Sequence, residues 1–286
     1  KLYNTLSREN QNFNVTNDTV NMYVCGITPY DSAHLGHAMS AIVFDVIRRY
    51  LEFKGFKVNY IQNFTDVDDK MIKAANLQNI EVSELADKNI AEYLHELKTL
   101  NVKVATKYPK ATEEIPAIID LISQLIENKF AYAIDGDVYF RVNSDKDYGK
   151  LSNRKVEDLL AGARLEIDEN KEFPADFALW KKHKQNEPFW PSPWGNGRPG
   201  WHIECSAMAL KYLGDSIDIH GGGLDLVFPH HENEIAQSRC ANDTKVFAKY
   251  WLHNAFITMS NEKMAKSQGN ILKIKDFRNK VSGQVL

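Results

Sequence analysis

The chain has 286 residues, of which 43% are hydrophobic and 26% charged, the proportions of a soluble globular protein. Its 35 basic and 38 acidic residues leave a formal net charge of −3, which excludes a strongly basic nucleic-acid coat protein. No apolar run approaches the roughly 18 residues that a membrane-spanning helix needs, and the first residues lack the form of a signal peptide. We therefore expect a cytoplasmic protein with no membrane partner.

Three cysteines occur in the chain, at Cys25, Cys205 and Cys240. This odd and sparse number cannot form a disulfide framework, and it fits a reducing compartment. Any special role of these thiols therefore depends on their neighbours.

The first part of the chain predicts a strand, a loop and a long helix. The polar segment from Lys1 to about Asp18 predicts an arm or an edge strand, and the β-prone run Val20–Cys25 predicts a buried strand. A loop over residues 28–37 follows. Apolar residues then recur at helical spacing between Ile42 and Leu51, and Gly55 ends the pattern.

A second strand and helix follow directly. Lys57–Ile61 predicts the strand, and Thr65 followed by Asp68 resembles a capping box that opens the next helix. The order strand, helix, strand, helix forms a βαβ unit, which implies a parallel sheet.

The middle of the chain has a different pattern. Residues from Ser83 to Lys129 are mostly helical in pattern, and Asp137–Val142 predicts a strand of an inserted module. The run Pro191–Gly200 is rich in proline and glycine and predicts a loop.

A second α/β block follows the inserted module. It comprises a helix near Ala207–Leu213, a strand at Ser216–His220, a helix after Pro229 and a strand at His253–Thr258. We predict an α/β fold in which a Rossmann-like parallel sheet, a nucleotide-binding catalytic domain, is split by an inserted α+β connective module. The predicted parts are residues 1–110 and 200–258 for the two halves, 111–199 for the module, and 259–286 for a lysine-containing loop and the start of a helical region. Function is expected at the carboxyl ends of the strands.

The segment His34-Leu-Gly-His37 lies between a predicted strand and helix. Gly36 permits close backbone approach, and the helix N-terminus with two histidines suits a phosphate group. Taken alone, the same residues also fit two polar loop histidines.

A second short motif, Lys263-Met-Ala-Lys266-Ser267, follows the last predicted strand. Two lysines on a loop can clamp a polyphosphate as point charges, although most such pairs are solvated surface. The order and the separation of the two motifs, about 225 residues, resemble the paired signatures of class I aminoacyl-tRNA synthetases. That resemblance implies that His34, His37, Lys263 and Lys266 stabilise the triphosphate of ATP, bound with Mg²⁺, as pyrophosphate leaves.

Four further residues have the chemistry of a zinc site: Cys25, Cys205, His230 and Glu234. His230 and Glu234 are four residues apart and share a helix face. The spacing is not that of a zinc finger, and each cysteine by itself also fits a small buried hydrophobic residue.

Longer blocks resemble the cysteinyl-tRNA synthetase family over about residues 21–270. They are Met22-Tyr-Val-Cys-Gly-Ile-Thr-Pro-Tyr-Asp31, Asn63-Phe-Thr-Asp-Val-Asp-Asp-Lys70, Gly149-Lys-Leu-Ser152, Gly197-Arg-Pro-Gly-Trp-His-Ile-Glu-Cys-Ser206, His220-Gly-Gly-Gly-Leu-Asp225 and Phe228-Pro-His-His-Glu-Asn-Glu-Ile-Ala-Gln-Ser238. The resemblance implies one Zn²⁺ per chain that binds the thiolate of L-cysteine, ATP as co-substrate, tRNA(Cys) as acceptor, and a monomer. A thiolate-selective metal separates cysteine from serine better than pocket shape, which gives only about 10²-fold.

Other residues have weaker signals. Thr65, Trp201 and Asp225 are expected to contact the substrate, although Trp201 also fits a core residue and Asp225 a helix cap. His202 and His231 are expected to support the metal site without ligating the ion, and Cys240 to be an inert buried thiol.

The chain departs from the family pattern in two places. Ala265 replaces a serine of the lysine loop, and the helical bundle and anticodon-binding domain that normally follow are missing from this sequence. We therefore expect either the catalytic portion of such an enzyme or a natural short paralogue. Two rival readings are the related cysteine ligase of mycothiol synthesis, which transfers cysteine to an amino sugar, and a non-catalytic zinc- or tRNA-binding paralogue, in which damaged motifs are expected.

Overall fold

The computed structural model describes residues 1–156, 170–259, 262–264, 271–278 and 280–283. The chain forms two compact units, and each is described by itself. The first unit contains Lys1–Phe13, Ala111–Ile219 and Asp225–Trp251, and the second contains Asn14–Lys110, His220–Leu224 and Leu252–Leu286. In these described ranges, no helix has both the length and the apolar character needed to cross a membrane.

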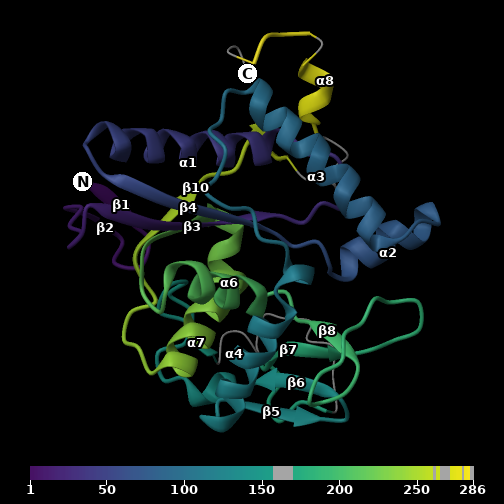
Figure 1. The fold of residues 1–286 in the computed structure, drawn as a ribbon. Helices are drawn as coiled ribbons and strands as arrows, with labels where there is room; N and C mark the ends of the chain where they lie inside the picture. The colour runs from purple at the N-terminus through teal and green to yellow at the C-terminus, as the bar shows by residue number, and fades with distance from the viewer. Residues whose placement is uncertain (157–169, 260–261, 265–270, 279, 284–286) are drawn as a thin grey trace. The chain divides into compact units, whose positions relative to one another are not determined.

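The second unit is built on a parallel sheet. Strands β3 (Thr19–Ile27) and β4 (Lys57–Phe64) pair in parallel, and α1 (Leu35–Phe53) connects them (Figure 1). The carboxyl-terminal parts of β9 (Ile217–Gly223) and β10 (Ala248–Asn254) extend this sheet in the order β10-β9-β3-β4. The predicted α/β fold with a parallel βαβ unit is confirmed.

Helices α2 (Asp69–Gln78) and α3 (Val82–Thr99) follow β4. The residue that caps α2 is Asp68, whose carboxylate accepts a hydrogen bond from the Met71 amide at 2.7 Å. The predicted capping box beginning at Thr65 is therefore wrong, because Asp68 is itself the extended N-cap residue and its own carboxylate closes the first turn.

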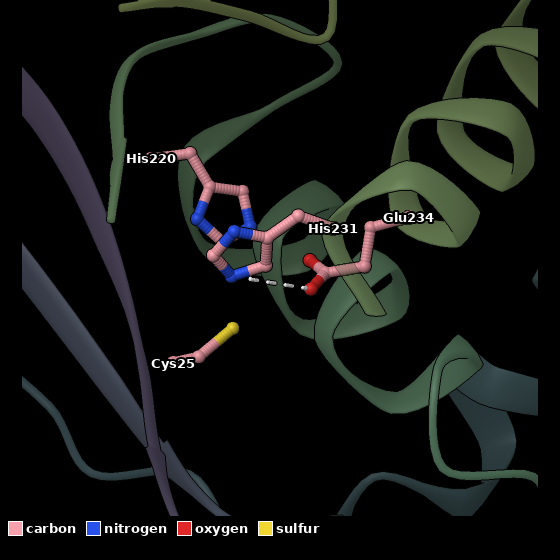
Figure 2. A group of neighbouring side chains, drawn as sticks. All are labelled: Cys25, His220, His231 and Glu234. Carbon is pink, nitrogen blue, oxygen red and sulfur yellow. Dashed lines mark ion pairs between the residues drawn. The ribbon is translucent and has the colours of Figure 1, made fainter. Parts of the chain in front are cut away.

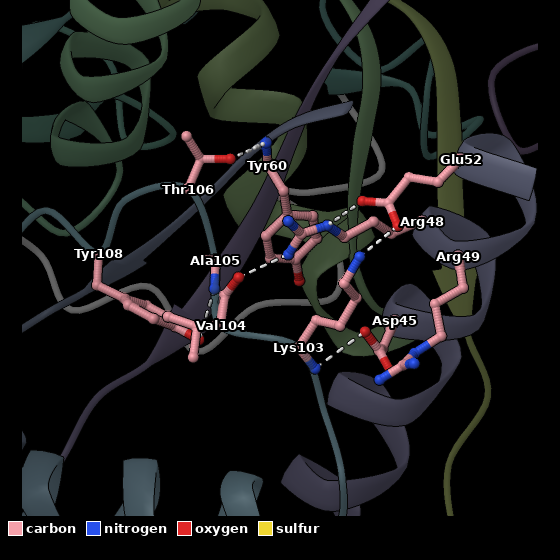
Figure 3. Close-up of polar contacts among 10 residues, drawn as sticks. All are labelled: Asp45, Arg48, Arg49, Glu52, Tyr60, Lys103, Val104, Ala105, Thr106 and Tyr108. Carbon is pink, nitrogen blue, oxygen red and sulfur yellow. Dashed lines mark hydrogen bonds and ion pairs between the residues drawn. The ribbon is translucent and has the colours of Figure 1, made fainter. Parts of the chain in front are cut away.

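The segment after α3 runs beside β4 and covers the edge of the sheet. Lys107 and Lys110 form parallel bridges with Ile61 and Phe64. A polar network fixes this segment to α1, as Figure 3 shows: Arg48 donates to the carbonyl of Val104 at 2.7 Å and to Glu52 at 3.1 Å. Paired charges thus close an edge that would otherwise expose unpaired backbone groups.

In the described part of the first unit, three helices and an antiparallel sheet pack around one apolar core. The helices are α4 (Ile115–Glu127), α6 (Ile203–Leu213) and α7 (Glu232–Asn242). The sheet has the order β5-β6-β7-β8 with strands Ala131–Ile134, Asp137–Phe140, Phe177–Lys182 and Gly197–Pro199. Ile118, Leu121, Ile122, Leu125, Phe140 and Trp180 have almost no exposed surface.

Short elements complete the described chain. They are β1 (Leu2–Asn4), β2 (Glu9–Gln11), β11 (Thr258–Met259), β12 (Glu262–Lys263), α8 (Ile274–Arg278) and the helical turns η1 (Ala111–Glu113), η2 (Val142–Ser144), η3 (Leu224–Leu226) and η4 (Val227–His231). The hairpin β1–β2 replaces the predicted arm or edge strand.

Two further predictions need correction. The last large strand is Ala248–Asn254 and not His253–Thr258, because Tyr250, Trp251 and Leu252 are the residues that are buried. The predicted loop Pro191–Gly200 contains β8, which pairs with β7 as an edge strand, a position that tolerates proline.

Candidate metal centre and nucleotide site

Three residues with metal-binding side chains meet in the first unit. Cys205 lies on α6, His230 in the turn η4 and Glu234 in the first turn of α7, and all three are buried. Cys205 Sγ lies 3.5 Å from His230 Nε2, which lies 3.0 Å from Glu234 Oε1. One ligand atom of each residue lies within 4.8 Å of those of the other two.

Hydrogen bonds between α6 and α7 hold this arrangement. The Gln237 side-chain amide on α7 donates to the His202 carbonyl and to Ser206 Oγ, both at 2.9 Å. Ser206 Oγ in turn donates to the carbonyl of Glu234 at 3.4 Å. These contacts of Ser206 and Gln237 therefore fix the separation of Cys205 and Glu234.

The electrostatics of the cluster favour a cation at its centre. Burial alone lowers the pKa of His230, but the Glu234 carboxylate and the Cys205 thiol raise that pKa to about 10. The second ring nitrogen of His230 lies 2.9 Å from Nδ1 of His202, whose pKa burial and the charge of His230 hold well below its usual range. Nε2 of His230 is thus the nitrogen that faces the thiol and the carboxylate.

The donor set fits Zn²⁺. Ordinary zinc–sulfur and zinc–nitrogen bonds at a tetrahedral angle separate the two ligand atoms by about 3.6 Å, close to the 3.5 Å between Cys205 Sγ and His230 Nε2. The distance of 3.0 Å from His230 to Glu234 is that of a charge-assisted hydrogen bond, in which a proton takes the place of a cation. Sulfur, imidazole and carboxylate are all usual zinc ligands.

The fourth predicted ligand, Cys25, belongs to the second unit, where it lies near the end of β3. There a ligand atom of His220 lies within 4.8 Å of the Cys25 sulfur. Figure 2 draws both side chains together with His231 and Glu234 of the first unit, whose dashed contact spans 4.0 Å. Sequence reasoning did not single out His220, although its position before three glycines in a strand is a usable signal.

The predicted substrate contacts lie in different surroundings. The Trp201 ring stacks on the His230 ring at 4.5 Å between centroids, so it braces the imidazole. Asp225 is exposed in η3, and Thr65 is buried directly after β4. These positions leave their roles toward a substrate as predictions.

The histidine motif at the start of α1 caps its own helix. His34 Nδ1 accepts from the Gly36 amide at 3.1 Å, and His37 Nδ1 accepts from the His34 amide at 3.2 Å. Because Nδ1 is the acceptor in each ring, the proton of each neutral imidazole is on Nε2. A Cβ on Gly36 would lie 2.9 Å from the His34 ring, so a side chain there would displace that ring. The motif therefore presents two donor nitrogens at a helix N-terminus, an arrangement that suits phosphate.

The flanks of the lysine loop lie against this motif within the second unit. The Leu35 amide donates to the Leu272 carbonyl, and the Ile274 amide donates to the Ala33 carbonyl, both at 3.0 Å. On the other flank, Met264 is buried and its methyl carbon would lie 3.7 Å from a Cβ on Gly36. Lys263 is in β12, whereas Ala265 and Lys266 lie outside the described residues.

Comparisons with known proteins place the chain in a family. The family model described as tRNA synthetases class I (C) catalytic domain matches residues 11–286. A cysteine–tRNA ligase of Dehalococcoides mccartyi strain BAV1 is 59% identical over 287 residues, and one of Pelagibacter ubique strain HTCC1062 is 56% identical over 288 residues. Each alignment covers 100% of this chain but only 63% and 64% of the respective relative.

A solved structure shows the same fold at low identity. The methionyl-tRNA synthetase of Mycobacterium tuberculosis, in complex with methionyl-adenylate, superposes with a TM-score of 0.68 at 15% identity. The match covers 91% of this chain and 62% of that one. With the match of the family model over nearly the whole chain, the conclusion is that this chain belongs to the class I (C) tRNA synthetase catalytic domain family.

Proposed function

We propose that this chain activates L-cysteine with ATP to cysteinyl-adenylate and that the whole protein transfers the cysteine to tRNA(Cys). The observation that carries the proposal is the buried Cys205–His230–Glu234 cluster, whose three donors suit a thiolate-selective metal. The names of the relatives, cysteine–tRNA ligases, support cysteine as the amino acid and favour tRNA over an amino sugar as the acceptor.

Cys25 is proposed as the fourth ligand of this site, with Cys205, His230 and Glu234. Zinc bound there would supply a soft Lewis acid that ionises the substrate thiol and prefers it to the hydroxyl of serine. The chain's own residues set the geometry: His202 fixes the orientation of the His230 ring, and Trp201 stacks against it.

Activation of the amino acid is assigned to the two motifs of the second unit. The Nε2–H groups of His34 and His37 donate to phosphate oxygens of ATP, and Gly36 lets the triphosphate approach the backbone. Lys263 and Lys266 neutralise the charge that develops on the leaving pyrophosphate. The substrate carboxylate attacks the α-phosphorus, an anhydride bond forms, and the bond to pyrophosphate breaks. Asp225 is proposed to accept the substrate ammonium.

Metal analysis of a matched pair of cysteine variants tests whether the Cys205–His230–Glu234 cluster holds zinc. The unmodified chain and Cys240→Ala are expected to hold about one zinc per chain, because Cys240 lies outside the cluster. Cys205→Ala is expected to lose nearly all of it. In protein reloaded with Co²⁺, added cysteine is expected to change the visible spectrum, while serine leaves it unchanged. Full zinc occupancy in Cys205→Ala would contradict the proposal.

A further inference from the structure

The β3–β4 ladder contains a register break at its carboxyl end. Val24 pairs with Gln62 and Ile27 pairs with Phe64, so two residues of β3, Cys25 and Gly26, stand opposite Asn63 alone. This is a β-bulge, a feature that re-aims side chains and often lies beside functional sites.

The side chain of Asn63 fills the gap that the bulge creates. Its Oδ1 accepts a hydrogen bond from the Gly26 amide at 2.9 Å, and the residue is 1% exposed. The backbones approach so closely that a Cβ on Gly26 would lie 1.6 Å from the Asn63 carbonyl oxygen. The amide that the bulge removes from the ladder is therefore satisfied by a side chain.

This contact fixes which way the Asn63 amide faces. A backbone N–H can only donate, so the oxygen of Asn63 must face Gly26 and the NH₂ group must face the other way. That group lies 3.4 Å from Thr65 Oγ1 and can only donate to it. The Thr65 hydroxyl is consequently an acceptor toward Asn63, and its own hydrogen remains available for another acceptor.

The available hydrogen is in a buried place. Thr65 is 3% exposed and follows β4 directly, at the strand end where parallel sheets bind ligands. In the part of the chain that the structure describes, Asn63 is the one hydrogen-bonding partner of the Thr65 hydroxyl. A buried donor without an acceptor is unfavourable, so a ligand that brings an acceptor gains from this site.

We propose that Asn63 is a positioning residue that makes the Thr65 hydroxyl a hydrogen-bond donor to an anionic acceptor atom of the amino-acid substrate. This inference rests on the proposed function. Cysteine bound as its thiolate offers two such acceptors, the carboxylate and the sulfur, whereas its ammonium group can only donate.

The test uses substitutions that change the direction of the hydrogen bond. In Asn63→Asp the carboxylate can only accept, so it takes the Thr65 hydrogen and leaves the hydroxyl as an acceptor toward the substrate. Calorimetry is expected to show cysteine binding weakened about tenfold or more. Asn63→Ala leaves the hydroxyl free to donate, so it is expected to weaken cysteine binding less than Asn63→Asp does. If Asn63 were only structural, Asn63→Asp would not weaken binding more than Asn63→Ala.

A double-mutant cycle shows whether Asn63 acts through Thr65. Thr65→Val is expected to weaken cysteine binding to a similar degree as Asn63→Asp, and Thr65→Ser to restore it. Neither Asn63→Asp nor Asn63→Ala is expected to weaken binding further in the Thr65→Val background. Thermal unfolding and zinc content identify the variants that fold. If Asn63→Asp does not fold, the double-mutant cycle of Asn63→Ala with Thr65→Val tests the inference.

Cysteamine, which lacks the carboxylate, identifies the acceptor. A loss on Asn63→Asp that disappears with cysteamine assigns the carboxylate, and a loss that persists assigns the sulfur. Unchanged cysteine affinity in folded Asn63→Asp or in Thr65→Val would overturn this inference and leave the proposed function standing. Additive effects of Asn63→Ala and Thr65→Val on cysteine affinity would do the same. Failure of the unmodified chain to bind cysteine would instead overturn the proposed function, and this inference with it.

Discussion

Binding of zinc to the Cys205–His230–Glu234 cluster is expected to release protons and to strengthen steeply with pH. The Glu234 carboxylate and the Cys205 thiol raise the pKa of His230 to about 10 in spite of burial, so this imidazole holds a proton at neutral pH in the metal-free protein. A metal requires the neutral ring and the thiolate forms of the cysteines. Each must therefore lose its proton before or during binding.

The magnitude follows from the separation between the assay pH and that pKa. At pH 7.5 a group with a pKa near 10 is deprotonated in only about one molecule in 300, so the apparent zinc affinity is lower by about 300-fold than at high pH. An imidazole with its ordinary pKa near 6.5 imposes almost no such penalty at pH 7.5. The affinity is therefore expected to keep rising through neutral pH, by about tenfold per pH unit from His230 alone.

Competition with a chromophoric chelator between pH 6.5 and 8.5 measures this slope, and calorimetry in two buffers of different ionisation enthalpy counts the protons released. The expected count at pH 7.5 includes about one proton from His230, and any further release comes from the ligating cysteines. Cys240→Ser is the matched control, because this thiol is outside the cluster and is expected to leave the count unchanged. An affinity that is flat with pH, or a binding enthalpy independent of buffer, would refute the reasoning.

Three further substitutions test other parts of the structure. Gly26→Ala places a Cβ 1.6 Å from the Asn63 carbonyl and is expected to lower the free energy of unfolding in urea by about 3 kcal/mol, against about 1 kcal/mol for Gly195→Ala, whose Cβ meets nothing within 4 Å. The side chain of Arg48 is 12% exposed, and Arg48→Met is expected to lower the free energy of unfolding by about 2 kcal/mol. Arg49 is 42% exposed, and Arg49→Met is expected to lower it by less than about 1 kcal/mol. Equal losses for the two variants would contradict the assigned network. Lys266→Ala is expected to slow cysteine-dependent pyrophosphate exchange by about 100-fold with little effect on cysteine binding, and a normal rate with a raised KM would contradict its proposed role.

The regular elements of the parallel sheet follow directly from the sequence. The run Val20–Cys25 and the strand Lys57–Ile61 lie inside β3 and β4. In β3 nearly every residue of the run is buried, which leaves a continuous apolar signal, and in β4 the residues Val58, Tyr60 and Ile61 favour a strand. Local pattern predicts the strand β10 several residues too late, since its boundary depends on the tertiary burial of Trp251 and Leu252. The three-residue strand β8 has no pattern of its own and exists because β7 offers it an edge.

The contacts of the candidate site are harder to predict from the sequence. Four residues between His230 and Glu234 predict a shared helix face, but nothing in the spacing places Cys205 within 3.5 Å of His230 Nε2. That contact depends on the packing of α6 on α7 through Gln237. The role of Asn63 also has no local signal, because it arises from a bulge in the partner strand.

Activation of cysteine by this chain is proposed to depend on a metal held by its cysteine, histidine and glutamate residues. The most direct test is cysteine-dependent exchange of pyrophosphate into ATP, before and after a chelator has removed the metal and after zinc has been restored. The expected exchange rate with serine is at most about one hundredth of the rate with cysteine. The cysteine-dependent exchange is expected to disappear on chelation and to return when zinc is added. Full cysteine-dependent exchange in protein that elemental analysis shows to be free of metal would contradict the account.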